Sequence, residues 1–133
     1  MNREQTRAVN AHKHITGLPD DPSMRKAYGT FCMKAPIMLK TMGPLQMLEF
    51  IRSRHKGDGA PTTTAGKAAL TLLGHLAKDI GVADEKELRR KVRGAELVDY
   101  MRLTHELDAA LLWYRRFAQS ELKASSTDAI GDT

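Results

Sequence analysis

A cluster of cationic and titratable side chains lies near the middle of the chain, in the stretch RSRHK. Its members are Arg52, Arg54, His55 and Lys56. Arginine binds phosphate through a fork of N–H donors, and lysine binds it as a point charge. The cluster falls in the last turn of an expected helix, where positive charge also complements the helix dipole. Because three cations and a histidine exceed what the dipole needs, a phosphate-binding role stays open.

The net charge of +5 is concentrated in the first part of the chain. Residues 1–60 hold ten Lys or Arg against five acids, whereas residues 61–133 hold eleven of each. This asymmetry favours a polyanionic partner, although a solvated face that binds nothing explains it about as well. Most of the aromatic residues are spaced as core residues, which disfavours stacking on single-stranded bases. Any nucleic acid is therefore expected to be bound through its phosphates.

Two other patterns resemble binding sites without meeting their requirements. The loop GDGAPTTTAGK at 57–67 resembles a phosphate-binding loop, but it lacks the Gly-Lys-Ser/Thr ending and a preceding strand. His12 and His14 point to different faces of a helix, and His75 and His105 are isolated in the sequence. A metal site is therefore not expected. The carboxylates alternate with Lys and Arg at ordinary surface spacing, which does not indicate acid–base catalysis.

The single cysteine, Cys32, excludes an internal disulfide and fits a reducing compartment. It lies between Phe31 and Met33, where a buried hydrophobic role is favoured over a nucleophilic one. The polar start of the sequence is unlike a signal peptide, and no run approaches the roughly 20 apolar residues that span a bilayer. We expect a cytoplasmic protein that has no enzymatic activity, no cofactor and no membrane partner.

Helical periodicity runs through nearly the whole sequence, and strict strand-like alternation is missing. The pattern predicts an all-α fold, a compact bundle of five to six helices with a long C-terminal helix. Residues 1–123 are expected to form a single helical domain, and residues 124–133 a disordered tail. The first helix is predicted over 3–16, and Ser23 is the expected N-cap of the second.

Proline and glycine mark the expected helix boundaries. Pro36 should end or bend the second helix, because it lacks an N–H group. Gly43 and Pro44 predict a tight corner between a short helical piece and the helix that leads to the basic cluster. Later, Gly81 should end a helix, and Asp84 should begin a short one with a capping box.

The last predicted helix, from about 96 to 123, carries apolar residues over an unusually broad face. Its heptad-like seam comprises Tyr100, Leu103, Leu107, Ala110, Tyr114 and Phe117. Further apolar residues beside this seam indicate a central helix, or one that contacts a partner subunit.

Several short motifs follow one another along the chain. In chain order they are Ala8 and Ala11, Tyr28, Pro36, then Gly43, Gln46, Leu48, Phe50 and Ser53-Arg54, then Tyr100-Met101-Arg102-Leu103-Thr104, and finally Trp113-Tyr114-Arg115-Arg116-Phe117-Ala118. Their order, over about residues 5–120, resembles the small helical subunit of the Cmr-type (type III-B) CRISPR RNA-targeting effector complex. Pro44 stands where that family usually has Leu, and one residue is inserted in the Tyr-Arg-x-x-Thr segment. The equivalent small subunit of the Csm (type III-A) complex is also helical and basic.

The resemblance implies a non-catalytic architectural subunit in antiviral defence. Its implied partners are other Cmr-complex subunits, copies of itself stacked along a filament, the guide RNA and the target RNA. From the placement of charge, independently of the motifs, we expect six side chains to contact RNA phosphates: Arg25, Lys34, Lys40, Arg52, Arg54 and Lys56. Sequence-independent phosphate contacts suit a guide-programmed complex, because base pairing supplies the specificity.

Two other functions remain open at this point. One is a small helical DNA-binding regulator, and the other is an oligomerisation scaffold that never contacts nucleic acid. A helix-turn-helix at Gly43 fits poorly, because a recognition helix reads bases with its N-terminal residues. Here that end is mostly apolar, from Pro44 to Met47, and the cations lie at the other end.

Overall fold

Five α-helices and no strand occur in residues 1–124, the part of the chain that the computed structural model describes. The helices are α1 (Arg3–Thr16), α2 (Pro22–Arg52), α3 (Thr64–Ile80), α4 (Glu85–Gly94) and α5 (Leu97–Glu121). The all-α prediction is confirmed, and so is the long C-terminal helix. Beyond residue 124, the predicted tail lies outside the described residues.

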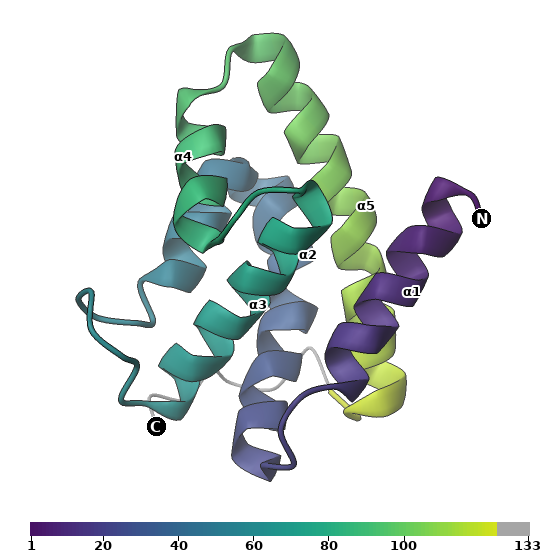
Figure 1. The fold of residues 1–133 in the computed structure, drawn as a ribbon, viewed down its shortest axis with the longest axis vertical. Helices are drawn as coiled ribbons and strands as arrows, with labels where there is room; N and C mark the ends of the chain where they lie inside the picture. The colour runs from purple at the N-terminus through teal and green to yellow at the C-terminus, as the bar shows by residue number, and fades with distance from the viewer. Residues whose placement is uncertain (125–133) are drawn as a thin grey trace.

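Helix α2 packs against three of the other described helices, α3, α4 and α5 (Figure 1). It packs against α3 and α5, and the short α4 packs against α3 and the second part of α2. Helix α1 lies along α5 and runs in the same direction (Figure 1). Arg3 therefore forms an ion pair with Glu106, and the last turns bring His12 beside Glu121.

The first part of α2 buries the face that the sequence predicted. Tyr28, Phe31, Cys32 and Ala35 are fully buried in the core, as expected. Burial also raises the pKa of the Cys32 thiol well above its ordinary value, so the thiol stays protonated and fits its interpretation as a core residue.

The start and the interior of α2 differ from the predictions. The N-cap is Asp21 rather than Ser23, and its carboxylate accepts a hydrogen bond from the Ser23 amide at 3.1 Å. Pro22 then occupies the first helical turn, where a missing N–H group costs nothing. The expectation that Pro36 ends the helix is wrong, because only Gly43 departs from helical geometry within α2.

Helix α5 supplies a polar contact at the Pro36 turn. The Arg115 guanidinium donates a hydrogen bond of 2.8 Å to the carbonyl of Met33, which lies less than one turn before Pro36. Proline disturbs the helical hydrogen bonds of the preceding turn, so a donor from outside the helix compensates for part of the loss. Arg115 belongs to the C-terminal motif, and this contact gives it a structural role.

The predicted corner at Gly43 is confirmed. Gly43 has φ +84° and ψ 169°, a conformation that residues with a side chain rarely adopt, and α2 bends there. The ψ value places Gly43 outside the left-handed helical region. Pro44 follows at once and begins the second helical part of α2. The bend allows this second part to lie against α4.

The remaining helix boundaries agree with the predictions. Gly81 ends α3 in the left-handed conformation, with φ +92°. Asp84 caps α4 by accepting a hydrogen bond of 2.9 Å from the Glu87 amide, but among the described contacts the reciprocal bond of the predicted capping box, from the Asp84 amide to the Glu87 side chain, is not formed. On α5 the seam residues from Leu103 to Tyr114 are buried, whereas Met101 and Leu112 on its broader apolar face remain exposed.

Candidate nucleic-acid interface

The six predicted RNA-contacting cations lie on α2 and the segment after it, but the structure divides them among separate surfaces. Arg25 borders a pocket between the start of α2 and the residues that follow α5. Lys40 borders a groove between the bend of α2 and the first half of α5. Arg54 and Lys56 line a third pocket, where α2 ends and α3 begins. Only these last two are brought together at one pocket.

Arg25 and Arg52 form hydrogen bonds to the backbone of the protein itself. Arg25 donates hydrogen bonds of 2.9 Å to the carbonyls of Leu18 and Pro19, which fixes the turn between α1 and α2. Arg52 donates to the carbonyls of His55 and Gly57 and so holds the chain where it leaves α2. RNA contact by Arg25 or Arg52 stays a prediction, and replacing either residue would also disturb a turn.

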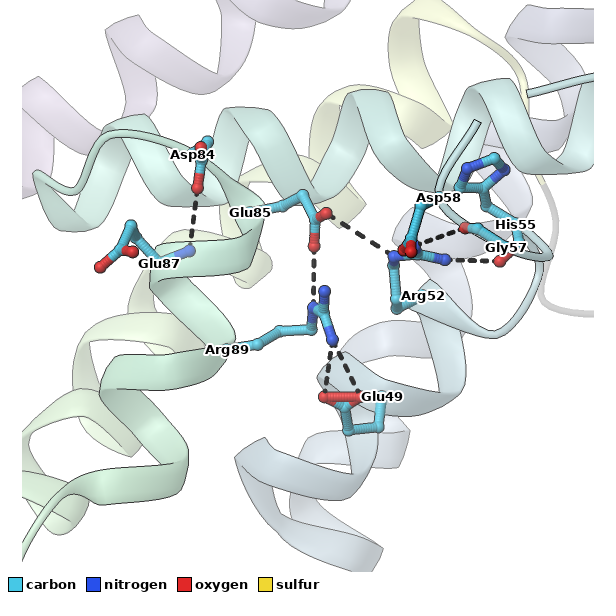
Figure 2. Close-up of polar contacts among 9 residues, drawn as sticks. All are labelled: Glu49, Arg52, His55, Gly57, Asp58, Asp84, Glu85, Glu87 and Arg89. Atoms are coloured by element: carbon cyan, nitrogen blue, oxygen red, sulfur yellow. Dashed lines mark hydrogen bonds and ion pairs between the residues drawn. The ribbon is translucent and has the colours of Figure 1, made fainter. Parts of the chain in front are cut away.

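Arg52 further belongs to an ion-pair network that joins α2 to α4 (Figure 2). Glu85 lies between two guanidinium groups, at 3.6 Å from Nε of Arg52 and 2.8 Å from Nε of Arg89. Arg89 also binds both carboxylate oxygens of Glu49, at 3.1 and 3.3 Å. Burial alone would lower the pKa of Arg89, but its hydrogen bonds to Glu85 and Glu49 raise it. This network was not predicted from the sequence, because Glu49 and Arg52 are far from Glu85 and Arg89 in the chain.

The three lysines of the set differ from the arginines. Lys40 and Lys56 are exposed and Lys34 is half-buried. Within the described residues, no hydrogen bond or ion pair is formed by any of these three ammonium groups. They are therefore the members of the predicted set whose charge is not already neutralised by a contact in the fold.

The pocket at the end of α2 has a volume of about 360 Å³ and is lined by basic and small polar residues. Ser53, Arg54, His55 and Lys56 follow the end of α2, Thr62 and Thr63 directly precede α3, and Ala65 lies in its first turn. No carboxylate belongs to this lining among the described residues. The Arg54 guanidinium also lies 5.9 Å from the centre of the Phe50 ring, at cation–π distance.

A second polar cluster lies in the interior, where the sequence indicated isolated histidines. The rings of His14 and His75 stack, with their centres 4.1 Å apart. His14 Nδ1 lies 2.6 Å from the Tyr114 hydroxyl, which donates a hydrogen bond of 2.6 Å to Asp79. His75 Nδ1 lies 2.8 Å from the Tyr28 hydroxyl. The interpretation of His75 as isolated is wrong, because α1 and α3 cross at this point.

Burial has opposite effects on the acids and bases of this cluster. The pKa of His75 is lowered to about 4, mainly by burial and further by the neighbouring His14 and Lys78. Burial also lowers the pKa of His14, together with the charges of Lys78 and Lys13. It raises the pKa of Asp79 to about 6, although the hydrogen bond from Tyr114 acts in the other direction. Both imidazoles are therefore neutral near pH 7, which fits a structural cluster.

Two general features bear on the class of function. Residues 1–124 contain no group of three or more His, Cys, Asp or Glu arranged to hold a metal ion. None of the helices in the same part of the chain is long and apolar enough to cross a membrane.

Comparison with known proteins gives a consistent result. A family model described as CRISPR-associated protein (Cas_Cmr5) matches residues 3–121. The CRISPR system Cmr subunit Cmr5 of Thermus thermophilus is 38% identical over 97 residues, which cover 72% of this chain and 75% of that protein. The crystal structure of a CRISPR-associated Cmr5 family protein from Thermus thermophilus matches with a TM-score of 0.77 at 32% identity, over 90% of this chain and 97% of that one. The motif-based resemblance is confirmed, and the chain belongs to the Cmr5 family of CRISPR-associated proteins.

Proposed function

We propose that this chain is a non-catalytic architectural subunit of a Cmr-type CRISPR ribonucleoprotein complex in the cytoplasm. In this role copies of the chain stack within the complex, contact other Cmr subunits, and hold guide and target RNA through basic side chains. The relative from Thermus thermophilus is named as a Cmr subunit, which supports the assembly part of the proposal.

The observation that carries the RNA part of the proposal is the state of Lys34, Lys40 and Lys56. Their ammonium groups have no acidic partner among the described residues, whereas Arg52 and Arg89 share Glu85 between them. An ammonium group without a protein partner is available to a phosphate and loses no internal ion pair on binding. Contacts of this kind fix a protein on the RNA backbone without reading sequence.

An exposed apolar patch supports assembly with other subunits. Leu97, Val98 and Met101, at the start of α5, have 73%, 79% and 63% of their surface exposed. They adjoin a groove between α5 and the bend of α2, which is lined in part by Leu39 and Pro44. Adjacent exposed apolar side chains mark protein contacts more often than isolated ones do.

The experiment that tests the RNA part compares two triple variants in the assembled complex. The first replaces Lys34, Lys40 and Lys56 by Ala, and the charge-matched control replaces Lys86, Lys91 and Arg93 on α4. The control residues are exposed cations without an ion pair in the described structure. RNA retention is then measured as a function of salt concentration.

The first variant should weaken RNA retention and reduce the log–log salt slope by about 2 units, since each lost single-strand phosphate contact contributes about 0.7. The control should retain RNA as the wild type does. Equal slopes for the wild type and the first variant would contradict the assignment. Tighter binding of duplex DNA than of single-stranded RNA would instead favour a DNA-binding regulator.

A further inference from the structure

The pocket between the end of α2 and the start of α3 has a helix N-terminus on one side. Thr63 caps α3, and its hydroxyl accepts a hydrogen bond of 2.9 Å from the Gly66 amide. The preceding amides, of Thr64 and Ala65, belong to the first turn, where N–H groups have no partner within the helix. The first turn of α3 contains no acidic residue that would neutralise the positive end of the helix dipole.

His55 provides an independent indication of a ligand in this pocket. Only 6% of its surface is exposed, yet its ring forms no hydrogen bond or ion pair with any described residue. The ring lines the pocket and points away from the Arg52 guanidinium, which binds the carbonyl of the same residue (Figure 2). Because the ring has no hydrogen-bond partner in the described fold, its N–H group is available to a ligand in the cavity. A ligand with acceptor oxygens would accept that hydrogen bond.

The charges around the pocket select the sign of the ligand. Lys56 and Arg54 line it together with His55, and no carboxylate does so in the described structure. The nearest acid in the following loop, Asp58, lies 3.9 Å from the Arg52 guanidinium. The groups that face the cavity are therefore hydrogen-bond donors or cations, which suits an oxyanion.

Close packing of the backbone explains the glycine in the first turn of α3. A Cβ atom on Gly66 would lie 3.3 Å from the Arg54 carbonyl and 3.0 Å from the Thr63 hydroxyl. Only glycine lets the end of α2 approach the start of α3 this closely. The loop at 57–67 lacks the sequence features of a phosphate-binding loop. It nevertheless brings the backbone amides at the start of α3 close to the basic cluster.

We infer that this pocket is a phosphoryl-binding site, in which the Ala65 amide in the first turn of α3, the His55 ring and the Lys56 ammonium group hold one phosphate group. The inference rests on the proposed function in taking RNA as the source of that phosphate. The same chemistry is offered by an internal phosphodiester of the RNA backbone and by a terminal phosphate. Binding at a helix N-terminus is independent of base sequence.

The decisive variant is Thr64→Asp. An aspartate in the first helical turn favours the helix dipole, so the variant should fold at least as well as the wild type. Its carboxylate, on the residue between Thr63 and Ala65 of the pocket lining, repels a phosphate bound in the pocket. The matched control is Ser23→Asp, which adds the same charge to the first turn of α2, far from the pocket along the chain.

The first measurement is a titration of the isolated chain with inorganic phosphate, followed through its amide and histidine ring NMR signals. The wild type and Ser23→Asp should show saturable shifts at Thr64, Ala65 and His55, and Thr64→Asp should bind about tenfold more weakly or worse. Shifts spread over surface lysines, or equal binding by Thr64→Asp, would overturn the inference.

The second measurement uses the assembled complex and short RNAs with and without a 5′-phosphate. Weaker retention of both RNAs by Thr64→Asp identifies an internal phosphodiester, and weaker retention of only the phosphorylated RNA identifies a terminal phosphate. If Thr64→Asp retains RNA normally while the triple lysine variant does not, the pocket inference is overturned and the proposed function stands. If neither variant changes RNA retention, both are overturned.

Discussion

The imidazole rings of His14 and His75 stack face to face, with their centres 4.1 Å apart and their planes inclined by 6°. One ring comes from α1 and the other from α3. Each ring also reaches a tyrosine hydroxyl, from Tyr114 of α5 and Tyr28 of α2. The pair therefore links four of the five helices through one polar cluster, and the fold depends on the charge of that cluster.

The cluster predicts opposing pH effects from His75 and Asp79. As pH falls from 6.5 towards 4, His75 takes up a proton in the unfolded chain but not in the folded one, so stability falls. Between pH 6 and 3.8, Asp79 takes up a proton in the folded chain but not in the unfolded one, so stability rises. Between about pH 6 and 4 the loss of stability from His75 and the gain from Asp79 nearly cancel. The lowered pKa of His14 adds a further loss of stability as the pH falls.

Single substitutions should separate these effects. Asp79→Asn removes the gain in stability that comes from protonation of Asp79 in the folded chain. Between pH 6.5 and 4.5, the free energy of unfolding of this variant should therefore fall by about 1–2 kcal/mol more than that of the wild type. The opposite is expected for His75→Gln, whose free energy of unfolding should fall less than that of the wild type as the pH is lowered. The measurement is urea denaturation across this pH range, with Asp20→Asn as an exposed control. Parallel pH curves for the wild type and both variants would contradict this account of the cluster.

Arg115 should stabilise α2 at Pro36. Arg115→Met removes the donor to the Met33 carbonyl and should lower the free energy of unfolding by about 1.5–3 kcal/mol, the usual range for a hydrogen bond to a charged group. The neighbouring Arg116 is exposed and serves as the matched control, since Arg116→Met should change stability by less than about 0.5 kcal/mol. Equal losses in the two variants would show that the Met33 contact contributes nothing.

Two glycines should respond oppositely to alanine. Gly43→Ala should destabilise by about 1–2 kcal/mol, because its φ of +84° is unfavourable for any residue with a Cβ atom. The new Cβ would approach only the Tyr100 hydroxyl, at 3.4 Å, so the cost comes from the backbone. Gly74→Ala, in open space on α3, should stabilise by about 0.5–1 kcal/mol. Thermal and urea unfolding measure the stability of both variants. An unchanged stability of Gly43→Ala would contradict the claim that the bend in α2 requires glycine at this position.

The apolar patch at the start of α5 should affect assembly but not folding. The double variant Val98→Gln and Met101→Gln removes exposed apolar surface, so its stability should stay within about 0.5 kcal/mol of the wild type. It should nevertheless be incorporated poorly into the Cmr complex, as measured by co-purification. Val9→Gln, at a half-exposed apolar residue of α1, is the control and should be incorporated normally.

Local rules predicted most of the fold. The ends of α1 and of α3, the corner at Gly43 and the cap at Asp84 depend on residues within a few positions of each other, and all of them are present in the structure. The expectation that Pro36 ends the helix is wrong, and α2 receives a hydrogen bond near this residue from Arg115, on a distant helix. The helix-breaking tendency of proline takes no account of a contact from another helix.

The candidate site was less accessible to sequence reasoning. The set of basic residues was chosen by charge alone, which does not reveal that Arg25 and Arg52 bind backbone carbonyls. The stacking of His14 on His75 depends on how α1 crosses α3, which periodicity does not specify. One signal was present in the sequence, since the cluster at 52–56 directly precedes the Gly- and Thr-rich loop that leads to α3.

The central claim is that this chain contacts RNA inside a Cmr-type complex, and the most direct test is ultraviolet crosslinking in the complex purified from its native host through a tag on this chain. After digestion, mass spectrometry identifies the peptides that carry crosslinked RNA. We predict that RNA of guide length and other Cmr subunits co-purify, and that crosslinks fall on peptides within residues 34–67. Co-purified RNA that crosslinks only to other subunits, or a chain that purifies without RNA, would contradict the claim.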